Sequence, residues 1–290
     1  MTKWFEEHLP KIILAPSFLA ILLFVYGFIA WTGWVSLTRS KLLPKYDIVG
    51  VIQYERLFAS PRWDTAFNNL LIFGLLFIVI SMILGLFLAI LLDQRIRVEG
   101  ALRTIYLYPM ALSMIVTGTA WKWIMNPGLG IEKMVRDWGF ENFNFDWVIN
   151  PDMALYAIVI AAVWQASGFV MALFLAGLRS VDGEIIKAAQ VDGIPNWRIY
   201  SAIIIPTMAP IFLSAFIVLA HLAIKSFDLV IALTGGGPGY ATDLPATYMY
   251  AMAFSRGDIG QAAGSAMVMM AVVFAIVVPY LYSELRVKND

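Results

Sequence analysis

The 290-residue chain contains no cysteine and only two histidines, His8 and His221. Disulfide bonds, thiolate metal sites and histidine-rich metal sites are therefore excluded. Charged residues make up only 14% of the chain, whereas an ordinary soluble domain has about a quarter. Positive and negative charges balance, which removes the electrostatic basis for binding nucleic acid. No Gly-Lys pair occurs, so there is no P-loop and no sign that this chain hydrolyses ATP.

Hydrophobic residues, by contrast, make up 61% of the chain and gather into long runs. A helix needs about 20 apolar residues to cross a bilayer core of about 30 Å. Six runs qualify or nearly so, and they predict an all-α membrane protein with a single transmembrane domain over residues 1–290. The expected spans are residues 12–38, 65–92, 104–123, 153–178, 199–232 and 259–283.

An even number of spans places both ends of the chain on the same side of the membrane. Basic residues are denser in the short segments that lie on the side of the N-terminus than in the longer loops opposite. Because basic residues favour the cytoplasmic side, this pattern predicts that both termini are cytoplasmic.

Prolines and small residues give the expected helices their shape. Two prolines at the start of the fifth run, Pro206 and Pro210, remove backbone hydrogen bonds and predict a kink. Small residues at four-residue spacing form ridges along which membrane helices pack closely. These ridges are Ser81, Gly85 and Ala89 in the second run, and Gly168, Ala172 and Ala176 in the fourth.

The polar segment between the fourth and fifth runs, residues 180–200, predicts a short helix over residues 183–193. Asp182 is a good N-cap, and Glu184 in the first turn suits the helix dipole. Gly193 can adopt the left-handed conformation that ends a helix. Ala188 and Ala189 keep the exposed face low, so that another protein can approach closely. The alternative is a simple connector on the membrane surface.

Three ionisable residues in the fifth span, His221, Lys225 and Asp228, lie at positions i, i+4 and i+7. They share one helical face if the helix continues past Ile224. Burial of such groups in a bilayer is costly, so we expect them to face the bundle interior or a wet cavity. One interpretation is a triad that faces the substrate or a gate. The other is a Lys225–Asp228 ion pair that only fixes packing.

The segment around Lys187-Ala188-Ala189 resembles the EAA loop of ABC importer permeases. In that motif Glu-Ala-Ala is followed after three residues by Gly, here Gly193, and later by Ile and Leu-Pro. This sequence has Lys187 in place of the motif Glu, and Ile205 in place of Leu. In the family this loop is the coupling helix, which docks on a cytoplasmic ATPase. The resemblance implies that role for Glu184, Lys187, Ala188, Ala189, Asp192 and Gly193.

A second stretch, Leu233-Thr-Gly-Gly-Gly-Pro-Gly, resembles a signature of carbohydrate-importer permeases of the maltose and glycerol-phosphate type. Within that group the chain looks most similar to permeases of glucose- or mannose-type importers. In the family this region lies on the outer face, toward the sugar-loaded binding protein. The implied contacts with the binding protein are Gly236, Gly237, Pro238 and Thr242.

The resemblance implies the fold and the assembly of a type I ABC importer in a bacterial cytoplasmic membrane. The expected partners are a second permease, in a heterodimer, two ATPase subunits and an external sugar-binding protein. The chain itself would be no enzyme and hold no cofactor, since ATP and Mg²⁺ would bind to the ATPase. Candidates for the sugar pathway or its gate are Trp164, Gln165, His221, Lys225 and Asp228.

A proton-coupled secondary sugar transporter is the alternative function. In that case His221 and Asp228 would form the proton relay. Inverted repeats would support this alternative, but the two halves of the sequence show no obvious repeat.

Overall fold

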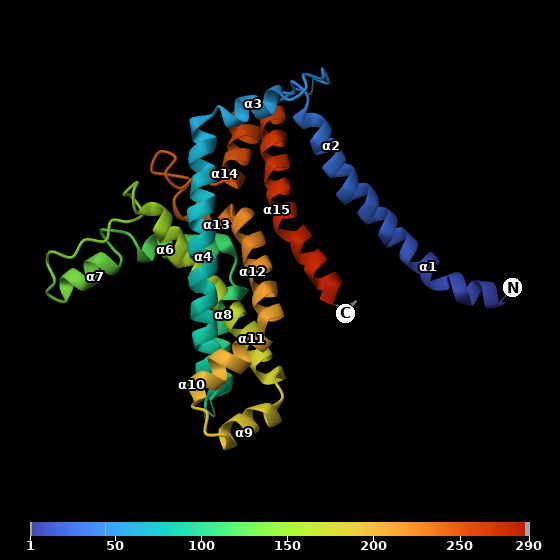
Figure 1. The fold of residues 1–290 in the computed structure, drawn as a ribbon. Coiled ribbons are helices and arrows are strands. Elements are labelled where there is room, and N and C mark those ends of the chain that lie inside the picture. Colours follow the sequence, from blue (N-terminus) through green and yellow to red (C-terminus); the bar gives the residue numbers. More distant parts are fainter. Residues whose placement is uncertain (1, 44, 95, 288–290) are drawn as a thin grey trace. The chain divides into compact units, whose positions relative to one another are not determined.

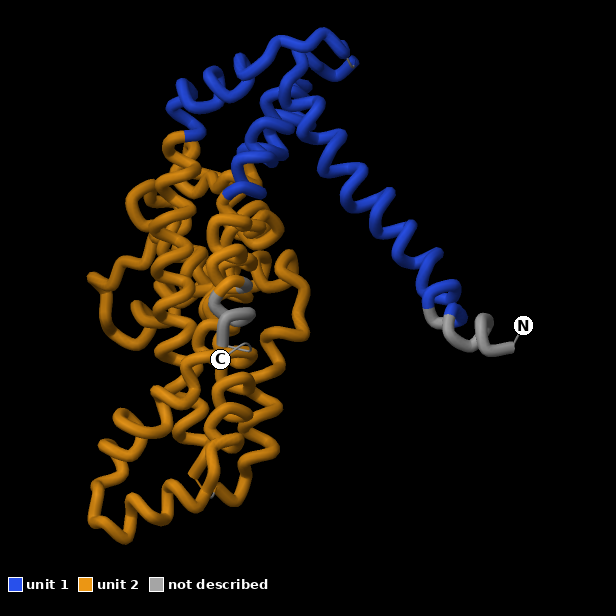
Figure 2. The backbone as a smooth tube through the Cα atoms, turned by 45° about the vertical axis from the view of Figure 1, so that its right-hand side comes forward, with its two compact units in different colours: residues 1–63, 248–271 blue, residues 64–247, 272–290 orange. Residues whose placement is uncertain are grey.

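The computed structural model describes residues 2–43, 45–94 and 96–287, and these residues are predominantly helical. The chain forms two compact units, coloured separately in Figure 2. Unit 1 comprises residues 1–63 and 248–271, and unit 2 comprises residues 64–247 and 272–290. The sequence predicts a single permease domain over residues 1–290. That prediction requires the two units to associate as one domain, and it stays a prediction.

Unit 1 begins with one long apolar helical stretch, in which a π-helical segment joins α1 to α2. Its described side chains are mostly exposed, as expected for a helix whose surroundings are lipid or another subunit. The other elements of unit 1 are the short helix α3, the end of α14 and the first part of α15. The bounds are α1 Thr2–Ile21, α2 Gly27–Ser36, α3 Ile52–Phe58, α14 Pro245–Tyr250 and α15 Ile259–Val287.

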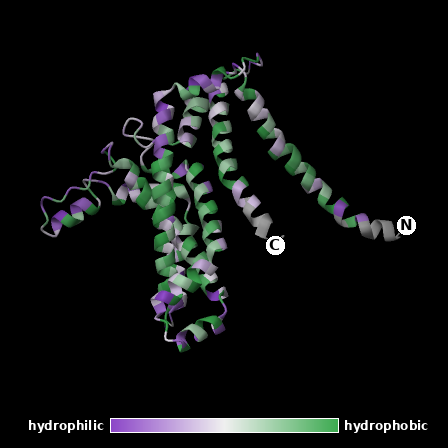
Figure 3. Cartoon of the chain, in the orientation of Figure 1, coloured by the Kyte–Doolittle hydropathy of each residue, from purple (hydrophilic) through white to green (hydrophobic). Residues whose placement is uncertain are grey.

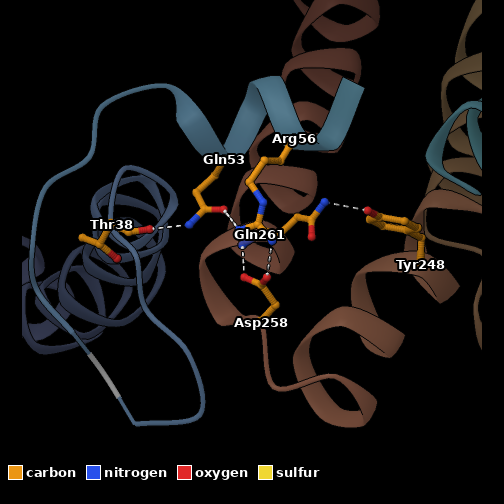
Figure 4. A network of polar contacts seen from close by, with 6 residues as sticks. All are labelled: Thr38, Gln53, Arg56, Tyr248, Asp258 and Gln261. Carbon is orange, nitrogen blue, oxygen red and sulfur yellow. Dashed lines mark hydrogen bonds and ion pairs between the residues drawn. The ribbon is translucent and has the colours of Figure 1, made fainter. Parts of the chain in front are cut away.

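A polar network inside unit 1 ties α3 to the start of α15 (Figure 4). The side-chain amide of the buried Gln53 donates to the carbonyl oxygen of Thr38 at 2.8 Å. Arg56 donates to Gln53 Oε1 at 3.1 Å and forms an ion pair with Asp258, also at 3.1 Å. Each buried amide atom of Gln53 thus has a partner, as stability requires.

The same network extends from Asp258 to the buried phenol of Tyr248 (Figure 4). Gln261 donates its backbone N–H to Asp258 Oδ1 at 3.3 Å and its side-chain amide to the Tyr248 hydroxyl at 3.0 Å. Burial is the main cause that raises the pKa of Tyr248 above its ordinary value, so the phenol stays neutral at physiological pH.

Unit 2 is a helical bundle built around α8, most of which is buried inside the chain. Helix α8 packs against α5, α6, α12 and α13 (Figure 1). The bounds are α4 Pro61–Asp93, α5 Glu99–Leu107, α6 Met114–Ile124, α7 Ile131–Asp137, α8 Ala154–Ser180, α9 Gly183–Val191, α10 Asn196–Ile199, α11 Ile205–Thr207, α12 Ala209–Ile224 and α13 Asp228–Leu233.

Glycines on the two predicted ridges are points where helices of unit 2 approach one another closely. A Cβ atom on Gly85 of α4 would lie 2.6 Å from Val170 Cγ1 of α8. A Cβ atom on Gly168 of α8 would lie 1.9 Å from the carbonyl oxygen of Tyr106 in α5. No larger side chain fits at either position, so the packing role expected from the sequence is confirmed there.

Four of the six expected spans are confirmed as helices long and apolar enough to cross a membrane. They are Lys11–Ser36, Pro61–Asp93, Ala154–Ser180 and Ile259–Tyr280. The fifth expected span is broken: its helices Asn196–Thr207 and Ala209–Ile224 meet at 67°. This bend confirms the predicted kink, because Pro206 and Pro210 flank it and each lacks a backbone N–H.

The prediction of one continuous helix over residues 104–123 is wrong. Helix α5 ends at Leu107, a 3₁₀ turn follows over Tyr108–Ala111, and α6 begins at Met114. Pro109 interrupts the hydrogen-bond ladder, and the Ser113 hydroxyl starts α6 by accepting from the backbone N–H of Ile115 at 3.2 Å. Hydropathy alone does not detect such a break, because every residue in the turn is apolar or aromatic.

Candidate functional site

Helix α9 and its flanking turns have the geometry that the sequence predicts for a coupling helix. At its start, Asp182 Oδ1 accepts from the backbone N–H of Glu184 at 2.9 Å. At its end, Gly193 has a φ of +74°. The next residue, Ile194, donates its backbone N–H to the carbonyl oxygen of Ala189 at 3.1 Å. This is a Schellman motif, which fixes where the helix stops and the chain turns back.

The exposed face of α9 differs from the predicted one at two positions, Ala189 and Val191. Ala188 is exposed, but Ala189 is only 6% exposed and packs inside the unit. The prediction that both alanines form the exposed surface is therefore wrong for Ala189. Val191, which the sequence reasoning missed, is 88% exposed. An apolar residue one helical turn after Ala188 was the signal that could have identified it.

Lys187, which stands where the EAA motif has Glu, forms an ion pair with Glu184 at 2.8 Å. Both side chains are largely exposed, and each partner neutralises the charge of the other. We name Glu184, Lys187, Ala188 and Val191 the outward face of α9, since all four are exposed. Asp192, the helix C-cap, is exposed beside this face.

A cavity of about 500 Å³ lies in the middle of unit 2, between α4, α8 and α12. Its volume falls in the range of small-molecule sites, which are mostly apolar with a few placed polar groups. Its wall is largely aromatic and aliphatic, with two polar side chains. Residues that line it include Phe73, Phe77, Gln165, Phe169, Leu222 and Ser226.

Gln165 supplies the unsatisfied polar group of this cavity. The side chain is only 5% exposed, and its Nε2 donates to the carbonyl oxygen of Leu112 at 2.8 Å. Its Oε1 has no hydrogen-bond partner within the described part of the chain. An unpaired buried acceptor is costly. This oxygen is enclosed by the chain, so a donor in the cavity reaches it only when the side chain turns toward the cavity.

Trp164, predicted beside Gln165 as a pathway residue, faces a different space. It lines a second cavity of about 540 Å³ and meets Trp121 edge-on, with ring centroids 5.8 Å apart. Consecutive residues on a helix point about 100° apart, and this separates Trp164 from the wall that Gln165 joins.

The three ionisable residues of the fifth span do not form the predicted helical face. Helix α12 ends at Ile224, Lys225 is its C-cap, and α13 begins at Asp228. No ion pair joins Lys225 to Asp228 in the residues that the structure describes. Together with His221 they are exposed on the surface of this chain. The break lies at the edge of the central cavity, because Ser226 lines it.

The Gly-rich turn after α13 is held together from inside. Gly235, Gly236 and Gly239 all have positive φ, and the turn closes on Thr242. The Thr242 hydroxyl, which is fully buried, lies 2.7 Å from the Thr234 hydroxyl and donates to the carbonyl oxygen of Gly237 at 3.0 Å. Thr242 is therefore a structural residue of the turn.

This burial leaves only part of the turn accessible to a binding protein. Gly236 is buried like Thr242, whereas Gly237 and Pro238 are half-buried. The exposed tip consists of Gly239 and Tyr240, which the sequence reasoning did not select. A turn residue with a polar side chain looks exposed in sequence, but Thr242 satisfies its hydroxyl inside the loop.

Comparison with known proteins identifies the family. Residues 81–286 match the family described as binding-protein-dependent transport system inner membrane component. The chain belongs to this family. The matched region contains α8, α9, the central cavity's α8 wall and the Gly-rich turn. As a binding-protein-dependent transport component, the chain has no need of the proton relay in the alternative prediction.

Relatives in the family are transport permeases. A probable ABC transporter permease protein of Pyrococcus horikoshii is 40% identical over 96% of both chains. A xylose/arabinose import permease protein of Haloferax volcanii is 36% identical, over 90% of this chain and 83% of the relative. A trehalose/maltose transport system permease protein of Thermococcus litoralis is 30% identical, over 99% and 97%.

Solved structures support the importer fold. A bacterial ABC transporter involved in alginate import has a chain that matches with a TM-score of 0.85 and 19% identity, over 98% of both chains. A bacterial alginate ABC transporter in complex with an alginate-bound periplasmic protein matches with a TM-score of 0.86. At this identity the likeness shows that this family member has the importer permease fold.

Proposed function

We propose that this chain is the membrane permease of an ATP-driven sugar importer and forms one half of the translocation pathway. The observation that carries the proposal is the family match together with relatives named for xylose, arabinose, trehalose and maltose. The central cavity supports it, since aromatic walls stack on sugar rings and amide groups meet sugar hydroxyls. The particular sugar is set largely by the binding protein.

Coupling to the ATPase runs through α9 in this proposal. Its outward face offers a low apolar patch, Ala188 and Val191, beside the neutralised Glu184–Lys187 pair. Such a patch suits a protein cleft better than lipid, because charged side chains and the two ends of the helix surround it. ATP and Mg²⁺ bind to the ATPase pair, and its closure moves α9 and the helices attached to it.

The implied assembly gives the chain four kinds of partner. A second, different permease forms a heterodimer with it, two ATPase subunits and an external binding protein complete the importer, and the lipid bilayer surrounds it. His221, Lys225 and Asp228 lie on the surface of this chain, and lipid is a poor environment for them. We therefore place them toward the second permease or a water-filled pathway between the two. Six spans, with both termini in the cytoplasm of a bacterium, complete the proposal.

Docking through α9 is tested with two substitutions at Ala188 in the affinity-tagged chain. Ala188→Arg raises a long charged side chain on the outward face, and we expect it to abolish co-purification of the ATPase subunits. Ala188→Ser keeps the surface low and is the matched control, which retains them. Unchanged ATPase recovery with Ala188→Arg would contradict docking through this face.

A further inference from the structure

The two chain segments that leave α9 are both attached to a single carboxylate, that of Asp93 at the end of α4. Asp93 Oδ1 lies 3.7 Å from Arg179 Nε, and Asp93 Oδ2 accepts from the Tyr200 hydroxyl at 3.3 Å. Arg179 also donates through Nη2 to Glu99 Oε1 at 2.8 Å. These contacts join the ends of α4, α5 and α8 with the segment that follows α10.

The positions of these residues in the chain make the arrangement a closed loop. Arg179 lies three residues before Asp182, the N-cap of α9, and Tyr200 lies seven residues after Gly193. The chain therefore leaves Asp93's partner Arg179, forms α9, and returns to Asp93 at Tyr200. We name Asp93, Arg179, Glu99 and Tyr200 the α9 clip.

Direct packing between α9 and α4 is incomplete at this point. A cavity of about 240 Å³ separates them, and its lining includes Asp93, Ile186, Gln190 and Tyr200. Buried apolar residues of the flanking segments, Leu178, Ile199 and Ile204, also line this space. The polar contacts of Asp93 bridge its edge beside them. The α9 clip therefore adds a polar connection between the flanks of α9 and α4 at a place where the two helices are not closely packed.

Helices α4, α5 and α8 also contact one another at a second place along their length, away from the α9 clip. The close approaches at Gly85 and Gly168 fix α4 and α5 against α8 far from the clip. Helices fixed at two levels neither rotate nor slide easily past one another. A displacement of α9 that reaches the clip thus moves the three helices as one body.

We propose that Asp93 is a positioning residue that makes α9 and the bundle of α4, α5 and α8 move together. The inference rests on the proposed docking of the ATPase on α9. Asp93 touches neither substrate nor ATPase in this scheme and acts only through Arg179 and Tyr200. A partly exposed ion pair stabilises a fold little, and Arg179 keeps its pair with Glu99 when Asp93 is replaced. The expected defect therefore lies in coupling and not in assembly.

The test measures a distance between α4 and α10 in the complete importer. The chain has no cysteine, so spin labels attach only at introduced residues, here Ile83→Cys and Arg198→Cys. Both native side chains are exposed, and neither belongs to the clip or to the outward face of α9. Electron spin resonance then gives the distance distribution with and without ATP and vanadate, which traps the closed ATPase.

With the clip intact we expect one narrow distribution that ATP and vanadate leave unchanged. With Asp93→Ala the distribution should broaden and shift on trapping, because the segment at Tyr200 is released from α4. Asp93→Asn keeps the shape and the bond to Tyr200, so its shift should be smaller. Arg97→Ala, an exposed arginine in the next turn without an ion pair in the described residues, is the control that behaves like the parent.

Two results would overturn the clip: a narrow, unshifted distribution with Asp93→Ala, or a shift on trapping in the parent itself. Co-purification of the ATPase separates this failure from a failure of the proposed function. If the ATPase binds the parent but not Ala188→Arg, docking on α9 stands whatever the distances show. If Ala188→Arg still binds the ATPase, docking itself is wrong.

Discussion

Three buried side-chain oxygens lack a hydrogen-bond partner in the described residues: Gln165 Oε1, Ser81 Oγ and Thr117 Oγ1. The first two differ in what surrounds them. Gln165 lines the central cavity, so a turn of its side chain would bring this oxygen to a donor on a ligand. Ser81 lies on a small-residue ridge of α4, where its role is to keep the helix surface low. An unpaired buried oxygen therefore suggests a ligand contact at Gln165, which adjoins a cavity, but not at Ser81.

This contrast gives a prediction for transport. Gln165→Leu removes the hydrogen bond that we expect to the cargo, worth about 1 kcal/mol, and should slow sugar uptake about fivefold. It also removes the bond from Nε2 to the carbonyl oxygen of Leu112, so the level of the inserted protein is measured alongside. Ser81→Ala removes an equally unpaired group and should leave uptake unchanged. The measurement is the initial rate of labelled maltose, trehalose and xylose uptake by cells that express the complete importer. Equal effects of the two substitutions would remove Gln165 from the pathway.

At the scale of elements, the turn after α9 depends on a backbone conformation and not on a contact. Gly193 has a φ of +74° and no atom within 4 Å of the position that a Cβ atom would occupy, whereas Gly183 has equal space but no positive φ. Any non-glycine residue at Gly193 meets strain from its own backbone, at about 1–2 kcal/mol. The turn at the end of α9 thus depends on the backbone conformation of Gly193.

The two glycines of the α9 segment, Gly183 and Gly193, are a matched pair for testing this dependence. Gly193→Ala should loosen the turn, raise amide hydrogen exchange in α9 and reduce the recovery of the ATPase. Gly183→Ala should leave both unchanged or protect α9 slightly, because alanine favours a helix. Hydrogen exchange with mass spectrometry measures the first effect and co-purification the second. Similar exchange in both variants would show that the left-handed turn is dispensable.

At the scale of the whole chain, polar residues collect where the helices of unit 2 end. Hydrophilic residues mark α7 and its loop and the α9–α10 segment, whereas the helices between are predominantly apolar (Figure 3). If α8, which is long and apolar enough to span a membrane, crosses the bilayer, the α7 loop before it and α9 after it lie on opposite sides. The proposed topology puts α9 in the cytoplasm.

Labelling of single cysteines tests this topology. Asn142→Cys, in the loop after α7, should react with a membrane-impermeant maleimide in intact cells, since Asn142 is exposed. Arg198→Cys, next to α9, should react only after the cells are permeabilised. The cysteine-free parent gives the background. The reverse labelling pattern would invert the topology and exclude docking of a cytoplasmic ATPase on α9.

Much of this protein was predictable from local sequence. Apolar length determined four spans, Asp182 and Gly193 determined the ends of α9, and Pro206 and Pro210 determined the bend in the fifth span. The family also followed from short motifs. These features depend on a few neighbouring residues, through capping, backbone dihedral angles and the length needed to cross a bilayer.

The tertiary structure decided which side chains face a cavity, a neighbour or the outside. Ala188 and Ala189 are adjacent and identical, yet only packing determines that Ala189 is the buried one. Trp164 and Gln165 are adjacent too, yet they line different cavities. Asp93 gains its partners from residues more than 80 positions away. Sequence by itself determined four spans, the bend in the fifth and the ends of α9, because those depend on local chemistry, whereas faces and long-range partners depend on how helices pack.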